Sequence, residues 1–224
     1  MAQGTVTIFG GSGFIGRYIV ERLADQGWTI RVAVRRPQRA QFLKPLGNVG
    51  QIVPIPCDLN SSAAIRSALE GVDAAINLVG IMQESGSQNF SNLQSQGARL
   101  IAETAAELGI GAFVQMSAIG ASEESGSEYA RTKAAGEEAV RKALPDAVIL
   151  RPSVVFGPED DFFNRFAVMA RLSPSCRLSV ADIQGSSRFT WATWPTPPCS
   201  PCRSPSATEN STNWADQGST ASGN

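Results

Sequence analysis

The segment from Thr5 to Gly16 limits the folds open to this chain more than any other stretch. Its first five residues, TVTIF, are β-branched or aromatic, which is typical of a buried parallel strand. Gly10, Gly13 and Gly16 then follow at three-residue intervals. In that order they permit a tight turn, a close approach of backbone to ligand, and close packing of a helix on the strand. The segment therefore predicts a strand, a glycine turn and a helix N-terminus, which together bind the phosphates of a dinucleotide.

The residues between these glycines belong to the same turn. The predicted phosphate-contacting set is therefore Gly10, Gly11, Ser12, Gly13, Phe14, Ile15 and Gly16. An amphipathic helix is expected from Phe14 to Gln26, and Gly27 separates it from a second strand at Trp28 to Val34. A glycine turn between a strand and a helix can also be purely structural, but this order of elements favours ligand binding.

Strand and helix patterns alternate along the chain as far as residue 151. Beyond the first two strands, the expected strands are 51–56, 73–80, 112–117 and 147–151, and the expected helices are 61–69, 93–108 and 129–142. Such alternation predicts an α/β fold, a doubly wound parallel sheet of the Rossmann type with right-handed crossovers. Ligands of such sheets bind at the carboxyl ends of the strands.

Two arginines, Arg35 and Arg36, follow the second predicted strand directly. At this position an acidic residue binds the ribose hydroxyls of NAD, whereas an arginine pairs with the 2′-phosphate of NADP. Because no acidic residue stands here, the sequence favours NADP(H) as the cofactor, with NAD(H) as the alternative. The competing interpretation is that both arginines are ordinary exposed residues at a strand end.

A second constellation, Tyr129 and Lys133, lies near the start of the last expected helix. Residues four apart share one face of a helix. An ammonium beside a phenol favours the phenolate, so we expect Lys133 to lower the pKa of Tyr129 and to make it an acid/base group. Lys133 can also donate to the ribose hydroxyls. The alternative is a surface helix that carries these two residues by chance.

The overall composition excludes several function classes. The chain has 224 residues, 19 Lys and Arg against 20 Asp and Glu, and a net charge of -1, so nothing indicates a nucleic-acid partner. It contains no histidine, which excludes His-based triads and the commonest zinc sites, and we predict no metal site. Of four cysteines only one precedes residue 170, so no disulfide framework is expected. No apolar run could cross a bilayer and no signal segment is evident, so a cytoplasmic protein without a transmembrane segment is expected.

Five segments carry a resemblance to a known group: GGSGFIG, VRRP, INLVGI, EYARTKAAGEEAV and ILRPSVVFGPEDDFFNRF. Together they resemble the atypical and extended short-chain dehydrogenase/reductases, NAD-dependent epimerase/dehydratase-like proteins. Within these they are similar to the NAD(P)H-binding accessory subunit of respiratory complex I, of the alpha-subcomplex subunit 9 type, and its bacterial homologues. The resemblance covers Thr5 to about Pro174.

The resemblance implies further cofactor contacts. Asp58 and Leu59 would flank the adenine, and the Pro152 and Ser153 backbone would reach the nicotinamide. The end of the fourth strand, Leu78, Val79 and Gly80, would run beneath the ribose on the nicotinamide side. Asp58 could instead cap the helix that follows it, and the two roles are compatible.

The same resemblance leaves turnover open. Active members carry a catalytic Ser or Thr after the fifth strand, where this chain has Ser117, Ala118 and Ile119. Ser117 is the candidate substitute, as a catalytic and cofactor-contacting residue, although Ala118 and Ile119 occupy the usual hydroxyl positions. Three functions therefore remain. The first is a complex I accessory-type protein that binds NADP(H) with little chemistry, and the second is an active oxidoreductase or nucleotide-sugar epimerase that uses Tyr129 and Lys133. The third is an NADPH-responsive scaffold for a protein partner. The first implies a membrane-associated respiratory complex or a quinone-related partner, at the inner side of a respiratory membrane.

The segment from Ser175 to Asn224 differs from everything before it, with three of the four Trp and three of the four Cys and no regular periodicity. We expect a dinucleotide-binding domain over 1–158, the start of a substrate-side lobe over 159–174, and an irregular tail over 175–224 that replaces the rest of that lobe. Read one base out of frame, Gln184 to Pro197 can encode RFQPVYVGDVADA, and Glu209 to Asn224 can encode KLYELGGPRVYSFRE. We hypothesise a frameshift near Pro174, which resequencing of the gene would refute if the tail codons cannot yield these blocks.

Overall fold

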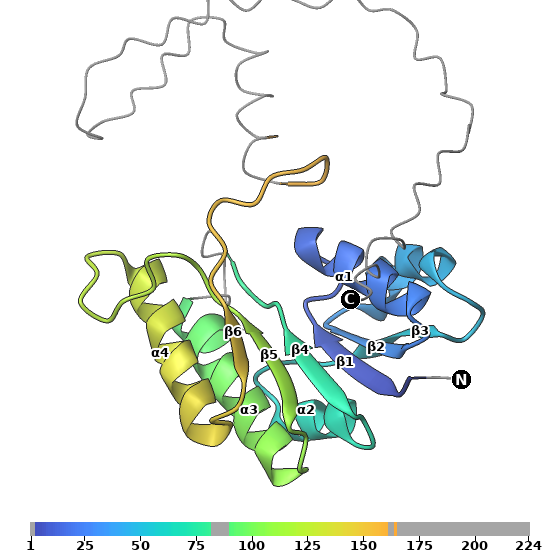
Figure 1. Cartoon of the computed structure of the whole chain (residues 1–224), viewed down its shortest axis with the longest axis horizontal. Helices are drawn as coiled ribbons and strands as arrows, with labels where there is room; N and C mark the ends of the chain where they lie inside the picture. Colours follow the sequence, from blue (N-terminus) through green and yellow to red (C-terminus); the bar gives the residue numbers. More distant parts are fainter. Residues whose placement is uncertain (1–2, 82–89, 161–163, 165–224) are drawn as a thin grey trace, which may run out of the picture. The chain divides into compact units, whose positions relative to one another are not determined.

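A single parallel sheet forms the centre of the structure (Figure 1). The computed structural model describes residues 3–81, 90–160 and 164. Six strands lie in the order β3-β2-β1-β4-β5-β6, and every neighbouring pair is parallel. Their bounds are β1 (Thr5–Phe9), β2 (Thr29–Val34), β3 (Ile52–Pro56), β4 (Ala74–Asn77), β5 (Ala112–Met116) and β6 (Val148–Leu150). The predicted doubly wound α/β sheet is confirmed.

Helical segments connect these strands. The α-helices are α1 (Phe14–Asp25), α2 (Ser62–Leu69), α3 (Gly97–Glu107) and α4 (Glu128–Ala143). A 3-10 helical segment, η1 (Pro37–Leu46), follows β2, and a π-helical segment, η2 (Ser91–Gln96), leads into α3. Among the helices of residues 3–81 and 90–160, none combines the length and apolarity needed to span a bilayer.

Successive side chains of the central strands point to opposite faces of the sheet, where they belong to two separate hydrophobic cores. In β1, Val6 and Ile8 are buried against α1 and η1, whereas Phe9 is buried against α2 and α3 on the other face. Thr7 also points to the second face, where its hydroxyl donates to the backbone carbonyl of Ala68 at 2.6 Å. This two-residue alternation with apolar side chains on both faces is what a parallel strand covered by helices requires.

The outer strands β5 and β6 are covered less evenly. Phe113 of β5 is buried on the face that α3 and α4 cover. On the opposite face Val148 and Leu150 of β6 remain 52% and 43% exposed. Within the part of the chain that the structure describes, no helix packs on this α1-side face of β5 and β6.

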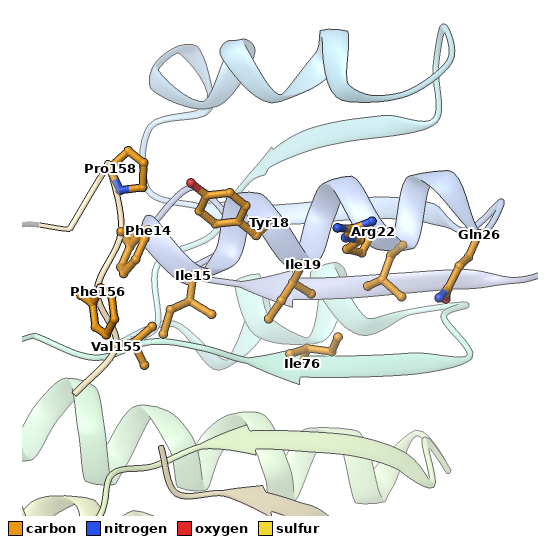
Figure 2. Close-up of a pocket in the computed structure, with 12 residues that line it drawn as sticks. Phe14, Ile15, Tyr18, Ile19, Arg22, Gln26, Ile76, Val155, Phe156 and Pro158 are labelled. Carbon is orange, nitrogen blue, oxygen red and sulfur yellow. The ribbon is translucent and has the colours of Figure 1, made fainter. Parts of the chain in front are cut away.

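An apolar groove of about 540 Å³ runs beside α1, at the border of that uncovered face. Figure 2 shows Ile15 and Ile19 of α1 pointing toward Ile76 of β4, with Phe14 and Phe156 at one end of the groove. The full lining is Phe14, Ile15, Tyr18, Ile19, Arg22, Leu23, Gln26, Ile76, Val155, Phe156, Gly157 and Pro158.

The element boundaries differ from the expected ones by a few residues. The segment η1 was not expected, and the helix predicted over 93–108 is divided between the π-helical turn η2 and α3. The strand predicted over 73–80 is β4, which ends at Asn77 because the Asn77 side chain accepts the backbone N–H of Val79 at 3.1 Å. The 3-10 segment η1 has no clear periodicity in the sequence, and helical periodicity does not distinguish a π-helical turn such as η2 from an α-helix. The predicted tail, 175–224, and most of the predicted start of the lobe, 159–174, lie outside the described residues.

The contact between α4 and η2 depends on Gly136. A Cβ atom at this position would lie 2.5 Å from the Gln94 carbonyl oxygen, which belongs to the backbone and cannot turn away. Replacing a helical glycine by alanine ordinarily stabilises a helix by about 1 kcal/mol, but an added methyl group in a packed site costs about 1–3 kcal/mol.

We therefore expect Gly136→Ala to lower the free energy of unfolding by about 1–2 kcal/mol, because a clash of 2.5 Å with a backbone atom puts the steric cost at about 2–3 kcal/mol, above the helical gain of about 1 kcal/mol. Urea unfolding followed by circular dichroism measures this change. Gly111→Ala is the control, since a Cβ there meets nothing within 4 Å. Equal stability of the two variants would show that α4 and η2 do not pack this closely.

Candidate dinucleotide-binding site

The glycine turn at the end of β1 is closed by backbone contacts. Gly10 has a φ of 78°, a conformation that favours glycine. The Gly13 N–H donates to the Gly10 carbonyl at 3.0 Å. A Cβ at Gly16 would lie 2.5 Å from that same carbonyl oxygen. The first and third glycines therefore allow the turn and the start of α1 to touch, as the sequence predicts.

The N-terminus of α1 fits an anionic ligand. Gly13 is the residue before the helix, and no side chain of the described structure caps it. The N–H groups of a first helical turn have no partner within the helix, and the helix dipole places partial positive charge there. Such an end suits a diphosphate, and Gly11, Ser12, Phe14 and Ile15 belong to the same turn.

The ends of β1 and β4 meet at the point where the winding of the sheet reverses. The strand order places β1 between β2 and β4. A Cβ at Gly10 would lie 3.2 Å from the Leu78 carbonyl carbon and 3.2 Å from the Val79 nitrogen. This switch point is where open α/β sheets bind their ligands. The predicted groups from two distant sequence segments therefore come together.

Arg35 and Arg36 lie at the carboxyl end of β2, and both are exposed. Arg36 immediately precedes η1, and its carbonyl accepts the N–H of Arg39 at 3.0 Å. The same segment also places Phe42 under Arg17 of α1, with the guanidinium 5.2 Å from the ring centroid. Arg17 is not among the site residues predicted from the sequence, although its place directly after Gly16 could have indicated it.

At the end of β3, the alternative role predicted for Asp58, as the cap of the next helix, is wrong. Ser61, and not Asp58, caps α2, since the Ser61 hydroxyl accepts the N–H of Ala64 at 3.3 Å. Asp58 Oδ1 instead accepts the backbone and side-chain N–H groups of Asn60, both at 3.0 Å. Asp58 is too far along the chain from the helix start to cap it, so its carboxylate shapes the turn. Leu59 is half-buried beside it.

Lys133 lies between the carboxyl ends of β4 and β5. Its side chain is only 5% exposed, and its Nζ donates to the carbonyls of Val79 at 3.4 Å and Met116 at 3.3 Å. A Cβ at Gly80 would lie 3.1 Å from Nζ, so Gly80 makes room for the ammonium. Burial lowers the pKa of Lys133 to about 8, although Glu137 acts in the opposite direction.

The pKa of Tyr129 is not lowered, contrary to the expectation from the sequence. Burial raises the pKa of its phenol. Its ring packs edge-on against Phe90, with centroids 5.9 Å apart. The expectation was wrong because Lys133 directs its ammonium to strand-end carbonyls and not to the phenol. Tyr129 and Lys133 nevertheless share one face of α4.

Ser117 follows β5 and turns toward α4. Its hydroxyl is buried and has no hydrogen bond of ordinary geometry within the described structure. It lies close enough to the Glu137 carboxylate to help lower the pKa of that group. The backbone N–H of Ser117 donates to the Leu150 carbonyl at 2.7 Å, and that of Ile119 to the Pro152 carbonyl at 2.9 Å. The segments after β5 and β6 therefore run side by side.

Two charged residues near this point were not selected from the sequence. Glu137 of α4 is 2% exposed, and Arg151 follows β6 and binds it through two hydrogen bonds. The sequence could have indicated Glu137, because it lies four residues after Lys133 and therefore on the same face of the helix. Pro152 and Ser153 come directly after Arg151, at the same edge of the sheet as the glycine turn. The groove beside α1 is a different feature and shares only Phe14 and Ile15 with the predicted site.

Comparison with solved structures supports the fold. A protein of the NAD-dependent epimerase/dehydratase type from Bacillus halodurans is 21% identical, with a TM-score of 0.61, over 70% of this chain and 74% of that chain. The enzyme WbmH of Bordetella bronchiseptica, solved in complex with NAD+, is 18% identical, with a TM-score of 0.61, over 74% of this chain and 63% of that chain. The fold and the glycine turn thus define an α/β domain of the Rossmann type.

The chain belongs to the NAD(P)H-binding family, whose profile matches residues 10–170. The 40 kDa subunit of NADH-ubiquinone oxidoreductase from Neurospora crassa is 34% identical over 171 residues, covering 76% of this chain and 46% of that protein. NADH dehydrogenase (ubiquinone) 1 alpha subcomplex subunit 9 of Rattus norvegicus is 36% identical over 162 residues, covering 72% and 43%. Ceramide reductase of Caulobacter vibrioides is 34% identical over 193 residues, covering 83% and 59%. The chain spans about half the length of these relatives, and the resemblance predicted from its motifs is confirmed.

The buried position of Lys133 predicts a pH dependence of stability. Its pKa is about 8 in the folded protein against an ordinary value of 10.5, so the unfolded chain binds more protons between these values. The contribution of Lys133 to stability should therefore rise with pH from about 8 to about 10.5. The Cys57 thiol acts in the opposite direction above about pH 9, because burial raises its pKa to about 11, so the Lys133 contribution is read from the difference between variants.

In Lys133→Met this rise should be absent, whereas Lys44→Met should retain it. Chemical denaturation at a series of pH values from 7 to 10.5 measures the difference between each variant and the original protein. A rise of the same size in Lys133→Met would show that Lys133 is not the group responsible.

Proposed function

We propose that this protein binds NADP(H) in preference to NAD(H), and that binding rather than turnover is its main role. The preference for NADP(H) rests on the residues at the end of β2. Arg35 and Arg36 are exposed there, and neither β2 nor the two residues that follow it include a carboxylate. A guanidinium matches the geometry of a phosphate through two parallel hydrogen bonds.

The residues at the carboxyl edge fit the parts of such a cofactor. The uncapped start of α1 would hold the diphosphate, and Asp58 with Leu59 would flank the adenine. Leu78, Val79 and Gly80 would lie beneath the ribose on the nicotinamide side, Lys133 would donate to its hydroxyls, and Pro152 with Ser153 would reach the nicotinamide. The bound cofactor would supply hydride chemistry.

Two features favour a binding role over turnover. The pKa of Tyr129 is raised by burial, which opposes its action as a base near neutral pH. The Ser117 hydroxyl is buried and interacts with the Glu137 carboxylate, so it is not exposed to a substrate in this structure. The names of two relatives, subunits of NADH-ubiquinone oxidoreductase, support a role in a respiratory complex. The partner would then be that membrane-associated complex or a quinone-related protein, with this chain held peripherally at the membrane.

A second candidate function is reduction of a carbonyl substrate by Tyr129 and Lys133. The shared helix face of these residues supports it, as does the relative named ceramide reductase. Ligand binding would have to bring the phenol toward the ammonium, since proton transfer needs a hydrogen-bond distance.

The cofactor preference can be measured by calorimetry with NADPH and NADH. We expect NADPH to bind at least about tenfold more tightly, which corresponds to about 1.4 kcal/mol. Arg35→Ala, or Arg36→Ala if that residue is the partner, should remove the difference and leave NADH affinity unchanged. Arg99→Ala is the control, because Arg99 pairs with Glu103 on α3 and is not one of the predicted cofactor contacts. Equal affinities in the unchanged protein would contradict the proposal.

Tyr129→Phe separates the two candidate functions. It should abolish any NADPH oxidation with a panel of carbonyl compounds but leave cofactor affinity nearly intact, because the hydroxyl serves only proton transfer. Lys133→Ala should weaken both. Turnover by the original protein that survives in Tyr129→Phe would rule out Tyr129 as the acid/base group.

A further inference from the structure

The Glu137 carboxylate is one of the most deeply buried charged groups of the described structure, with 2% exposure. Arg151 Nε donates to its Oε1 at 2.8 Å, and an Arg151 terminal nitrogen donates to its Oε2 at 2.5 Å. This two-point contact joins the middle of α4 to the first residue after β6. Burying a carboxylate is costly unless it is paired in this way.

Among the described residues, the charged groups that contact Glu137 are two arginines. Arg151 comes from the end of β6, and Arg141 lies 3.4 Å away on α4. Lys133 lies one turn earlier on the same helix, and the charge of Glu137 favours its ammonium without a direct contact. The Ser117 hydroxyl approaches from the end of β5. Although burial raises it, the pKa of Glu137 is lowered overall by Arg151, Ser117 and Arg141, so the carboxylate is ionised.

Glu137 also stands where two parts of the predicted cofactor site are connected. On one side Lys133 inserts between the ends of β4 and β5. On the other side Arg151 leads directly into Pro152, whose carbonyl accepts the Ile119 N–H at 2.9 Å. A shift of Arg151 would therefore move the end of β6, and loss of the Glu137 charge would leave Lys133 without its one facing carboxylate among the described residues.

We propose that Glu137 and Arg151 form a positioning pair, which keeps Lys133 as an ammonium and holds the Pro152–Ser153 segment in place for the cofactor. This inference rests on the proposed function for its effect on binding. Neither residue touches the cofactor in this proposal. Glu137 acts through Lys133, and Arg151 acts through the backbone that follows it.

A purely structural role of the pair makes a different prediction. If Glu137 only joined α4 to β6, its loss would weaken cofactor binding by the same factor at every pH. If it holds the Lys133 proton, the loss must depend on pH, because the amine of the variant is neutral over a range where that of the original protein is still charged.

The first experiment measures NADPH affinity of Glu137→Gln from pH 6 to pH 9.5. The ratio of its dissociation constant to that of the original protein should reach about tenfold near pH 7.5 and fall to about threefold or less at both ends of the range. Glu138→Gln is the matched control, since this neighbour on α4 is exposed and pairs with Lys142 at 2.6 Å. A ratio that does not vary with pH would overturn the proposal.

The second experiment does not require the cofactor. The chain contains three lysines, Lys44, Lys133 and Lys142, so a background with Lys44→Arg and Lys142→Arg leaves one lysine signal in a ¹³C-labelled protein. Titration by NMR should give a pKa near 8 for Lys133 and a lower value in Glu137→Gln. An unchanged pKa would overturn the inference, whereas absence of NADPH binding to the original protein would overturn only the proposed function.

Arg151→Lys tests the other half of the pair and replaces Glu137→Gln if that variant does not fold. It retains the positive charge but loses the two-point contact. We expect the pKa of Lys133 to stay near 8 while NADPH affinity falls about fivefold at all pH values. Unchanged affinity would show that Arg151 does not position the end of β6.

Discussion

The contact between the glycine turn and the start of α1 is the constraint on which the rest of the structure depends. The Gly10 carbonyl lies 2.5 Å from the place where a Gly16 side chain would begin, so only glycine lets the helix reach the turn. This contact sets α1 against β1 and directs its uncapped end toward the edge of the sheet. Every other predicted cofactor contact is located relative to that end, because the parallel strands finish at the same edge.

Polar groups buried between α4 and the sheet form a second constraint. Lys133, Glu137 and Arg151 alternate in charge, and each has its partners within the described structure. Such groups contribute little net stability, since desolvation offsets much of their attraction. Their position at the ends of β4, β5 and β6 instead gives them a role in arranging the site. The same burial that raises the pKa of Tyr129 lowers that of Lys133, because it disfavours the charged form of each.

The apolar groove beside α1 is bordered by exposed apolar residues of the described part of the chain. Val148 and Leu150 are exposed on the face of the sheet where α1 is the neighbouring helix, and Phe156 is 76% exposed near the groove. Exposed apolar surface of this kind marks a contact region for another part of a protein or for a partner. The matched part of this chain covers 46% and 43% of two relatives, and the tail from Ser175 onward is the segment for which we hypothesise a changed reading frame.

The sequence by itself determined the parallel sheet, the glycine turn, the position of Arg35 and Arg36, and the family, because each depends on neighbouring residues or on a fixed spacing. Only the tertiary structure decided that Lys133 binds the carbonyls of Val79 and Met116, that Ser61 caps α2, and that Glu137 pairs with Arg151. It also reversed the expected pKa of Tyr129. The physical reason is that hydrogen bonding and desolvation depend on distances between groups far apart in the chain, which spacing within a single helix does not encode.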